Sequence, residues 1–137
     1  MVYIQRRETF SASHRLYNSS WTEEKNFNVF GKCSNKRGHG HNFQLIVTVK
    51  GIVNPETGFV MNLADLKNII VNNIIDHVDH MNLNEDVPFL KEIIPSTENL
   101  AIVFWEVLSP LINNQGANLH CIRIIETENN SVEYFGK

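Results

Sequence analysis

Three histidines are the residues of this chain best suited to chemistry at a metal ion: His14, His39 and His41. Neutral imidazole is a common zinc ligand, and three of them leave one tetrahedral position open for water or a substrate. His39 and His41 are two residues apart, so an extended segment would place both rings on one face. Three unrelated surface histidines are the alternative. The His-x-His spacing, with a third histidine at a matching strand end, favours a metal site, and the all-nitrogen ligand set favours zinc.

Cys33 is the candidate base, because it lies six residues before His39 in a polar, turn-forming stretch. A thiol has a pKa of about 8.5, which a nearby cation or metal shifts easily. Since thiolate and imidazole both ligate zinc, Cys33 is alternatively a fourth ligand of a closed, structural site. Cys121 lies between His120 and Ile122 in a predicted strand, and we interpret it as a packed core thiol.

Carboxylate and imidazole groups elsewhere could move protons or bind a ligand. Asp79 and His80 are a candidate acid–base couple, although adjacent side chains on one strand would point apart. His77 is equally close to Asp79 in sequence and is a competing choice. Glu126 stands near a strand end, where it is either solvated or binds a guanidine-like edge through two parallel hydrogen bonds.

The elements that must position these residues are indicated by hydrophobic periodicity. Period-two alternation predicts strands over 3–14, 42–53, 119–127 and 132–135, and helical spacing predicts helices over 62–75 and 96–111. Residues 18–36, rich in Asn and Ser, are predicted to be a loop. The order ββααββ predicts an α+β fold, a four-stranded antiparallel sheet with two helices on one face. Because its two edges must be covered or paired, we expect an assembly rather than a monomer.

The composition bounds the class of protein. With 137 residues, 42% hydrophobic, the chain is expected to form a single domain, 1–137. The net charge of -3 gives no reason to expect a nucleic-acid or membrane partner. No signal-like segment is present, so the two cysteines are expected to be reduced and the protein cytoplasmic.

Eight short motifs together resemble the 6-pyruvoyl-tetrahydropterin synthase family of biopterin synthesis. They include Phe-Ser-Ala-Ser-His-Arg-Leu (10–16), Phe-Gly-Lys-Cys (30–33), Gly-His-Gly-His-Asn (38–42), Gly-Phe-Val-Met-Asn-Leu-Ala-Asp-Leu (58–66), Asp-His (79–80), Asp-Val-Pro (86–88), Ser-Thr-Glu-Asn (96–99) and Glu-Thr-Glu-Asn-Asn (126–130). The resemblance implies the tunnelling fold. In that fold three subunits join their sheets into a barrel, and two trimers stack as a homohexamer with active sites between subunits.

The resemblance also implies a reaction and a role for each residue. The implied enzyme is a zinc-dependent lyase that converts 7,8-dihydroneopterin triphosphate to 6-pyruvoyl-tetrahydropterin and triphosphate. The roles implied are zinc ligands for His14, His39 and His41, a proton-abstracting thiolate for Cys33, acid–base partners for Asp79 and His80, a pterin anchor for Glu126, and completion of the pterin pocket for Thr97 and Glu98. Mg²⁺ is implied with the triphosphate, and Arg15, Lys32, Lys36 and Arg37 offer positive charge near it.

Two other functions compete with this one. The queuosine-pathway 6-carboxy-tetrahydropterin synthases share the fold, the zinc site and the thiol, and loss of acetaldehyde from the substrate would identify them. A non-catalytic zinc module, with the metal serving only assembly, is the alternative from a different class. A relative that replaces the cysteine by glutamate is disfavoured by Cys33.

One regulatory motif is present. Arg-Arg-Glu-Thr (6–9) matches the pattern of basophilic kinases, which makes phosphorylation of Thr9 a hypothesis.

Overall fold

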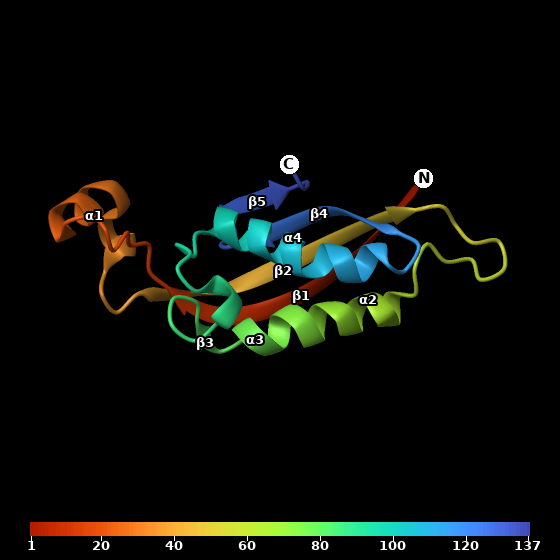
Figure 1. Ribbon diagram of the computed structural model, residues 1–137, viewed down its shortest axis with the longest axis horizontal. Helices are drawn as coiled ribbons and strands as arrows, with labels where there is room; N and C mark the ends of the chain where they lie inside the picture. The colour runs from red at the N-terminus through yellow and green to blue at the C-terminus, as the bar shows by residue number, and fades with distance from the viewer.

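A five-stranded sheet, in the order β3-β1-β2-β4-β5, is the framework of the computed structural model, which describes residues 1–137 (Figure 1). The strands are β1 (Val2–His14), β2 (His39–Gly51), β3 (Met81–Asn82), β4 (Asn118–Ile125) and β5 (Ser131–Tyr134). All neighbours are antiparallel except β3, which runs parallel to β1. The α+β class and the four longer strands predicted from the sequence are confirmed.

The prediction of four strands is wrong by one. β3 adds a fifth strand through only two pairs, Ala12 with Met81 and Ser13 with Asn82. Two residues are too few to show the alternation by which a strand is recognised in sequence. β3 is formed because the chain leaving the helices passes along the edge of β1.

The long hairpin-like pair β1 and β2 sets the geometry of one end of the sheet. Their thirteen-residue register runs from Val2 opposite Gly51 to His14 opposite His39. Alternate residues of β2 from Phe43 to Val49 are fully buried, as the period of a half-buried strand requires. The predicted pairing of the two strands, with His14 beside His39, is confirmed.

Helices cover one face of the sheet (Figure 1). They are α2 (Leu63–Ile70), a π-helical segment η2 (Val71–Ile75), α3 (Asp76–Val78) and α4 (Thr97–Asn113). Asn62 caps α2 by accepting from the N–H of Ala64, and Ser96 caps α4 by accepting from the N–H of Asn99. Both predicted helices are present, the first as α2, η2 and α3 in continuous succession. None of the helices combines the length and apolarity that a bilayer span requires.

The predicted loop 18–36 contains a helix, α1 (Glu23–Phe30), followed by the 3-10 turn η1 (Gly31–Ser34). A further 3-10 turn, η3 (Pro88–Leu90), precedes α4. α1 lies beyond the end of the sheet in Figure 1, and its apolar residues Phe27 and Val29 are exposed. Its one buried side chain is Asn26, which accepts from the N–H of Asn18 at 2.7 Å. The helix has no apolar face directed at the core, so periodicity could not reveal it.

Stacked aromatic rings close the core beneath the histidines. Phe10 and Phe43 stack with centroids 4.8 Å apart, and Phe104 of α4 meets Phe10 edge-on. The Phe43 ring also lies 5.7 Å from that of His14 and 5.4 Å from that of His41. The hydrophobic core therefore ends directly against the candidate metal ligands.

Replacing Phe43 by alanine should lower the free energy of unfolding by about 3–5 kcal/mol, because the ring is fully buried and its loss leaves a cavity. Urea titration at fixed protein concentration measures the change. Leu111→Ala is the control, since this side chain of α4 is 38% exposed and its truncation should cost less than about 1 kcal/mol. Equal costs for the two variants would contradict the position given to Phe43.

Candidate metal centre

The three histidines converge at the end of the β1–β2 pair. His14 is the last residue of β1, and His39 and His41 lie at the start of β2 on the same face. One donor atom from each lies within 4.8 Å of the other two. The three residues predicted from the sequence are thus brought together as a group able to bind one metal ion.

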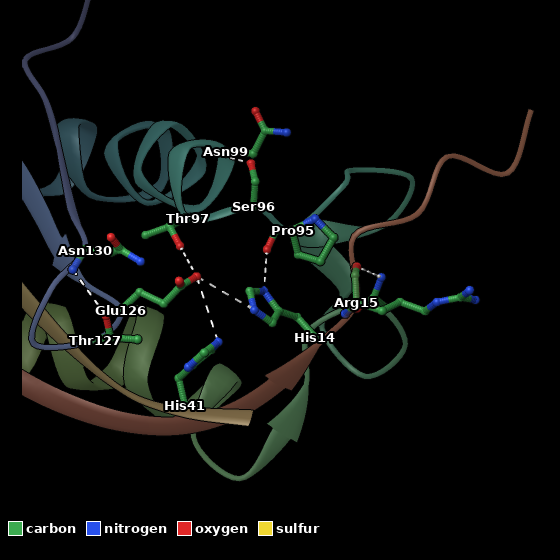
Figure 2. Close-up of polar contacts among 11 residues, drawn as sticks. His14, Arg15, His41, Pro95, Ser96, Thr97, Asn99, Glu126, Thr127 and Asn130 are labelled. Atoms are coloured by element: carbon green, nitrogen blue, oxygen red, sulfur yellow. Dashed lines mark hydrogen bonds and ion pairs between the residues drawn. The ribbon is translucent and has the colours of Figure 1, made fainter. Parts of the chain in front are cut away.

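His14 is held by a backbone carbonyl. Its ring is 1% exposed, and Nδ1 lies 2.8 Å from the carbonyl oxygen of Pro95 (Figure 2). A carbonyl can only accept, so Nδ1 carries the hydrogen and donates it, which leaves the lone pair on Nε2. Carbonyl partners of this kind orient metal-binding histidines in many proteins. His14 is therefore fixed in the tautomer that a metal ligand needs.

The donor nitrogens fit a metal ion. Nε2 of His14 and Nε2 of His41 are buried and have no hydrogen-bond partner. Burial lowers the pKa of both imidazoles below the ordinary value for histidine, against the opposing charge of Glu126. Neutral rings with free lone pairs bind metals, whereas a buried nitrogen left unpaired costs stability. An ion between the three rings would satisfy both orphaned atoms.

A cavity of about 420 Å³ opens in front of the histidines. It is lined by His14, Leu16, Cys33, His39, His41, Ser96, Thr97, Glu98, Glu126, Thr127, Asn130 and Val132. The thiol predicted to act as a base and the carboxylate predicted to bind a ligand therefore border one space with the metal group. The volume lies in the range of small-molecule sites.

Backbone contacts bring Cys33 back to the end of β1. The N–H of Leu16 donates to the carbonyl of Cys33 at 2.7 Å, and the Arg15 guanidinium donates to the carbonyl of Ser34 at 2.7 Å. Gly38 makes the close return possible, since its φ is +72° and a Cβ there would lie 2.8 Å from the carbonyl oxygen of His14. Any other residue at position 38 would separate the two strands at the site.

Glu126 and Thr97 are in direct contact on the wall of the cavity (Figure 2). The Thr97 hydroxyl donates to Oε2 of Glu126 at 2.7 Å, and that oxygen lies 3.9 Å from Nε2 of His14 and 4.0 Å from Nε2 of His41. Glu126 follows the end of β4, where its N–H donates to the carbonyl of Asn130 at 3.0 Å. The carboxylate is thus held between the metal group and the first turn of α4.

Asp79 and His80 do not line this cavity. His80 borders a separate hollow of about 310 Å³, which also contacts His41. Oδ1 of Asp79 accepts from the N–H of Ser11 at 2.9 Å, a bond that lowers the pKa of the carboxyl, and Oδ2 lies 3.1 Å from Nδ1 of His80. The expectation that these neighbours point apart is wrong. They lie between α3 and β3 rather than on a strand, and His80 has a φ of +63°. His77 contacts the carbonyl of Asn72 instead.

Comparison with known proteins agrees with this arrangement. The family model of 6-pyruvoyl tetrahydropterin synthase matches residues 3–137. The chain is 45% identical over 136 residues to the 6-pyruvoyl tetrahydrobiopterin synthase of Dictyostelium discoideum, covering 99% of this chain and 97% of that protein. It is 44% identical over 134 residues to the Homo sapiens protein of the same name, covering 98% and 91%. The chain belongs to the 6-pyruvoyl tetrahydropterin synthase family.

A solved structure supports the family at the level of the fold. The Caenorhabditis elegans 6-pyruvoyl tetrahydropterin synthase superposes with a TM-score of 0.92 at 39% identity, covering 99% of this chain and 96% of that one. The resemblance stated from the sequence motifs is therefore confirmed. So is the expectation that the chain is an enzyme of this family.

Sequence reasoning missed several residues of the candidate site. Pro95 contributes a carbonyl, and any residue type has one, so no sequence signal marks it. Asn130 and Thr127 line the cavity from the turn after β4, within the motif 126–130 of which only Glu126 was given a role. That motif was the available signal for them.

The two cysteines should react very differently. Burial raises the pKa of the Cys121 thiol to about 11, so at pH 8 only about one molecule in a thousand carries the reactive thiolate. Cys33 is half-buried and borders the open cavity. We expect iodoacetamide at pH 8 to alkylate Cys33 at least about tenfold faster, as measured by mass spectrometry of peptides. In Cys33→Ala, uptake of label should disappear over the same period. Equal labelling of both cysteines would contradict the burial of Cys121.

Proposed function

We propose that this chain is a zinc-dependent lyase that converts 7,8-dihydroneopterin triphosphate to 6-pyruvoyl-tetrahydropterin and triphosphate, in tetrahydrobiopterin biosynthesis. The observation that carries the proposal is the single cavity that places Cys33 and Glu126 beside three convergent histidines. Membership of the synthase family supplies the substrate class. We propose further that residues 1–137 act as one domain in the cytoplasm, where the two free thiols stay reduced.

We assign the metal site to zinc. His14, His39 and His41 would hold the ion through nitrogen alone, and a three-histidine set leaves a position open for a substrate oxygen. Bound there, zinc would supply Lewis acidity to the hydroxyl-bearing side chain of the substrate. We assign Mg²⁺ to the triphosphate, since the hard phosphate oxygens suit it.

Cys33 is assigned the role of base. Its thiolate would remove a proton from a hydroxyl-bearing carbon of the substrate side chain. The assignment is supported by its position on the cavity wall and by the turn that returns η1 to the end of β1. Cys121, buried on the opposite face of the sheet, takes no part.

Glu126 is assigned the role of pterin anchor, with Thr97 and Glu98 completing the pocket. A carboxylate accepts two parallel hydrogen bonds from an amino group and the adjacent ring N–H, which orients the substrate toward Cys33. The hydrogen bond from Thr97 holds one oxygen of Glu126 in the cavity. Arg15, Lys32, Lys36 and Arg37 are proposed to supply positive charge for the triphosphate.

Asp79 and His80 are assigned to the site of a neighbouring subunit. They do not border the cavity of their own chain, which is expected if sites form between copies. The outer edge of β1 before Ala12 and the outer edge of β5 have no partner strand in the chain. Pairing of these edges would close three sheets into a barrel. We propose that trimers of this kind stack as a homohexamer, in which Asp79 orients His80 for proton relay.

Two alternatives make different products or none. A 6-carboxy-tetrahydropterin synthase would release acetaldehyde from the side chain. A structural zinc module would use Cys33 as a fourth ligand and turn over no substrate.

The proposal predicts turnover by zinc-loaded protein incubated with 7,8-dihydroneopterin triphosphate. Chromatography should show triphosphate and a pyruvoyl product without acetaldehyde. Cys33→Ala should lower kcat by about 10²–10⁴-fold, the usual contribution of a general base. Chelation should stop the reaction and added zinc restore it.

Cys121→Ala is the matched control, because it removes the other thiol and leaves the cavity intact. Its turnover should stay within a few-fold of the unmodified protein. Acetaldehyde among the products would favour the carboxy-synthase. Absence of turnover by folded, zinc-loaded protein would refute the lyase assignment.

A further inference from the structure

A short turn in front of α4 holds the carbonyl that orients His14. We propose that the side chain of Asn99 fixes this turn and is thereby a positioning residue of the metal centre. The inference rests on the metal site proposed above, and it concerns a residue that touches neither the metal group nor the cavity.

The turn is built around Pro95. The N–H of Ser96 donates to the carbonyl of Ile94 at 2.8 Å, a three-residue turn with proline at its centre. The proline ring fixes φ near the value that such a turn requires, and its lack of an N–H costs no hydrogen bond there. The turn directs the Pro95 carbonyl at Nδ1 of His14, 2.8 Å away.

Asn99 ties this turn to the helix by two separate bonds. Its backbone N–H donates to the Ser96 hydroxyl at 3.2 Å, which caps α4 (Figure 2). Its side-chain amide donates to the carbonyl of Ile94 at 2.9 Å, so that this oxygen accepts from both Asn99 and Ser96. The orientation of Pro95 is thus fixed relative to the rigid first turn of α4.

The identity of the residue matters for only one of these bonds. Any residue at position 99 supplies the capping N–H, so the helix start does not require asparagine. Only a side chain with an N–H donor of this length reaches Ile94. Aspartate has the same shape and suits a helix N-terminus, yet as a carboxylate it has no hydrogen to donate.

The same helical turn carries Thr97, whose hydroxyl holds Glu126. The first turn of α4 therefore positions both the metal ligand His14 and the carboxylate Glu126. It does so through the side chains of Ser96, Thr97 and Asn99. A shift of the turn would reorient His14 without any change in the three ligands themselves. Loss of such an outer partner commonly weakens metal binding by about 10- to 100-fold.

The test measures zinc affinity by competition with a chromophoric chelator for the unmodified protein, Asn99→Asp and Asn99→Ala. We expect both variants to bind zinc about 10- to 100-fold more weakly. The Tm of metal-free Asn99→Asp should stay close to that of the unmodified protein. The absorption bands of the cobalt-loaded variants should also change, since His14 would be reoriented.

Asn68→Ala is the matched control, because Asn68 lies exposed on α2 and its side chain makes no hydrogen bond. Its zinc affinity should be unchanged. If Asn99→Ala does not fold, Asn99→Asp decides the question. Affinities within about threefold of the unmodified protein, or losses that only follow an equal fall in metal-free Tm, would overturn the inference. Absence of zinc binding by the unmodified protein would instead overturn the metal site itself.

Discussion

The hydrogen bond from Nδ1 of His14 to the carbonyl of Pro95 is the contact on which the arrangement of the site depends. It joins the end of β1 to the segment that starts α4, two elements far apart in sequence. It also selects the tautomer that directs a lone pair into the cavity. Because His14 is buried, the alternative tautomer would leave both the carbonyl and a ring N–H without partners, at a cost of about 1–3 kcal/mol each.

Other features of the site hold His14 and the segment around Pro95 where this hydrogen bond can form. The full register of β1 with β2 brings His14 opposite His39, and Gly38 permits the close approach of the chain at that end. The stacked pair Phe10 and Phe43 supports the rings from below. The same helix start that supplies Pro95 places Thr97 against Glu126, so metal group and carboxylate are positioned by one element.

The sequence predicted the residues of the site better than the contacts between them. His14, His39, His41 and Cys33 were found because imidazole and thiol have few other roles at such spacing, and the β1–β2 pairing followed from alternation. The strand β3 was not predicted because two residues are too few to show the alternation of a strand. The helix α1 was not predicted because it is held by hydrogen bonds of the polar Asn26 rather than by an apolar face. Pro95 acts through its backbone carbonyl, which every residue possesses, and the Asn99 side chain donates to the backbone carbonyl of Ile94, so both contacts could be seen only in three dimensions. The contact between Asp79 and His80 depends on a positive φ that no local pattern indicated.

The most direct test of this account is X-ray absorption at the zinc edge of the metal-loaded protein. The account predicts one zinc ion per chain with three imidazole nitrogens at about 2.0–2.1 Å, a further light-atom ligand and no sulfur. This result would match an open site in which Cys33 is free to act as a base. A sulfur at about 2.3 Å would contradict it, because the thiol would then complete a closed, structural zinc site.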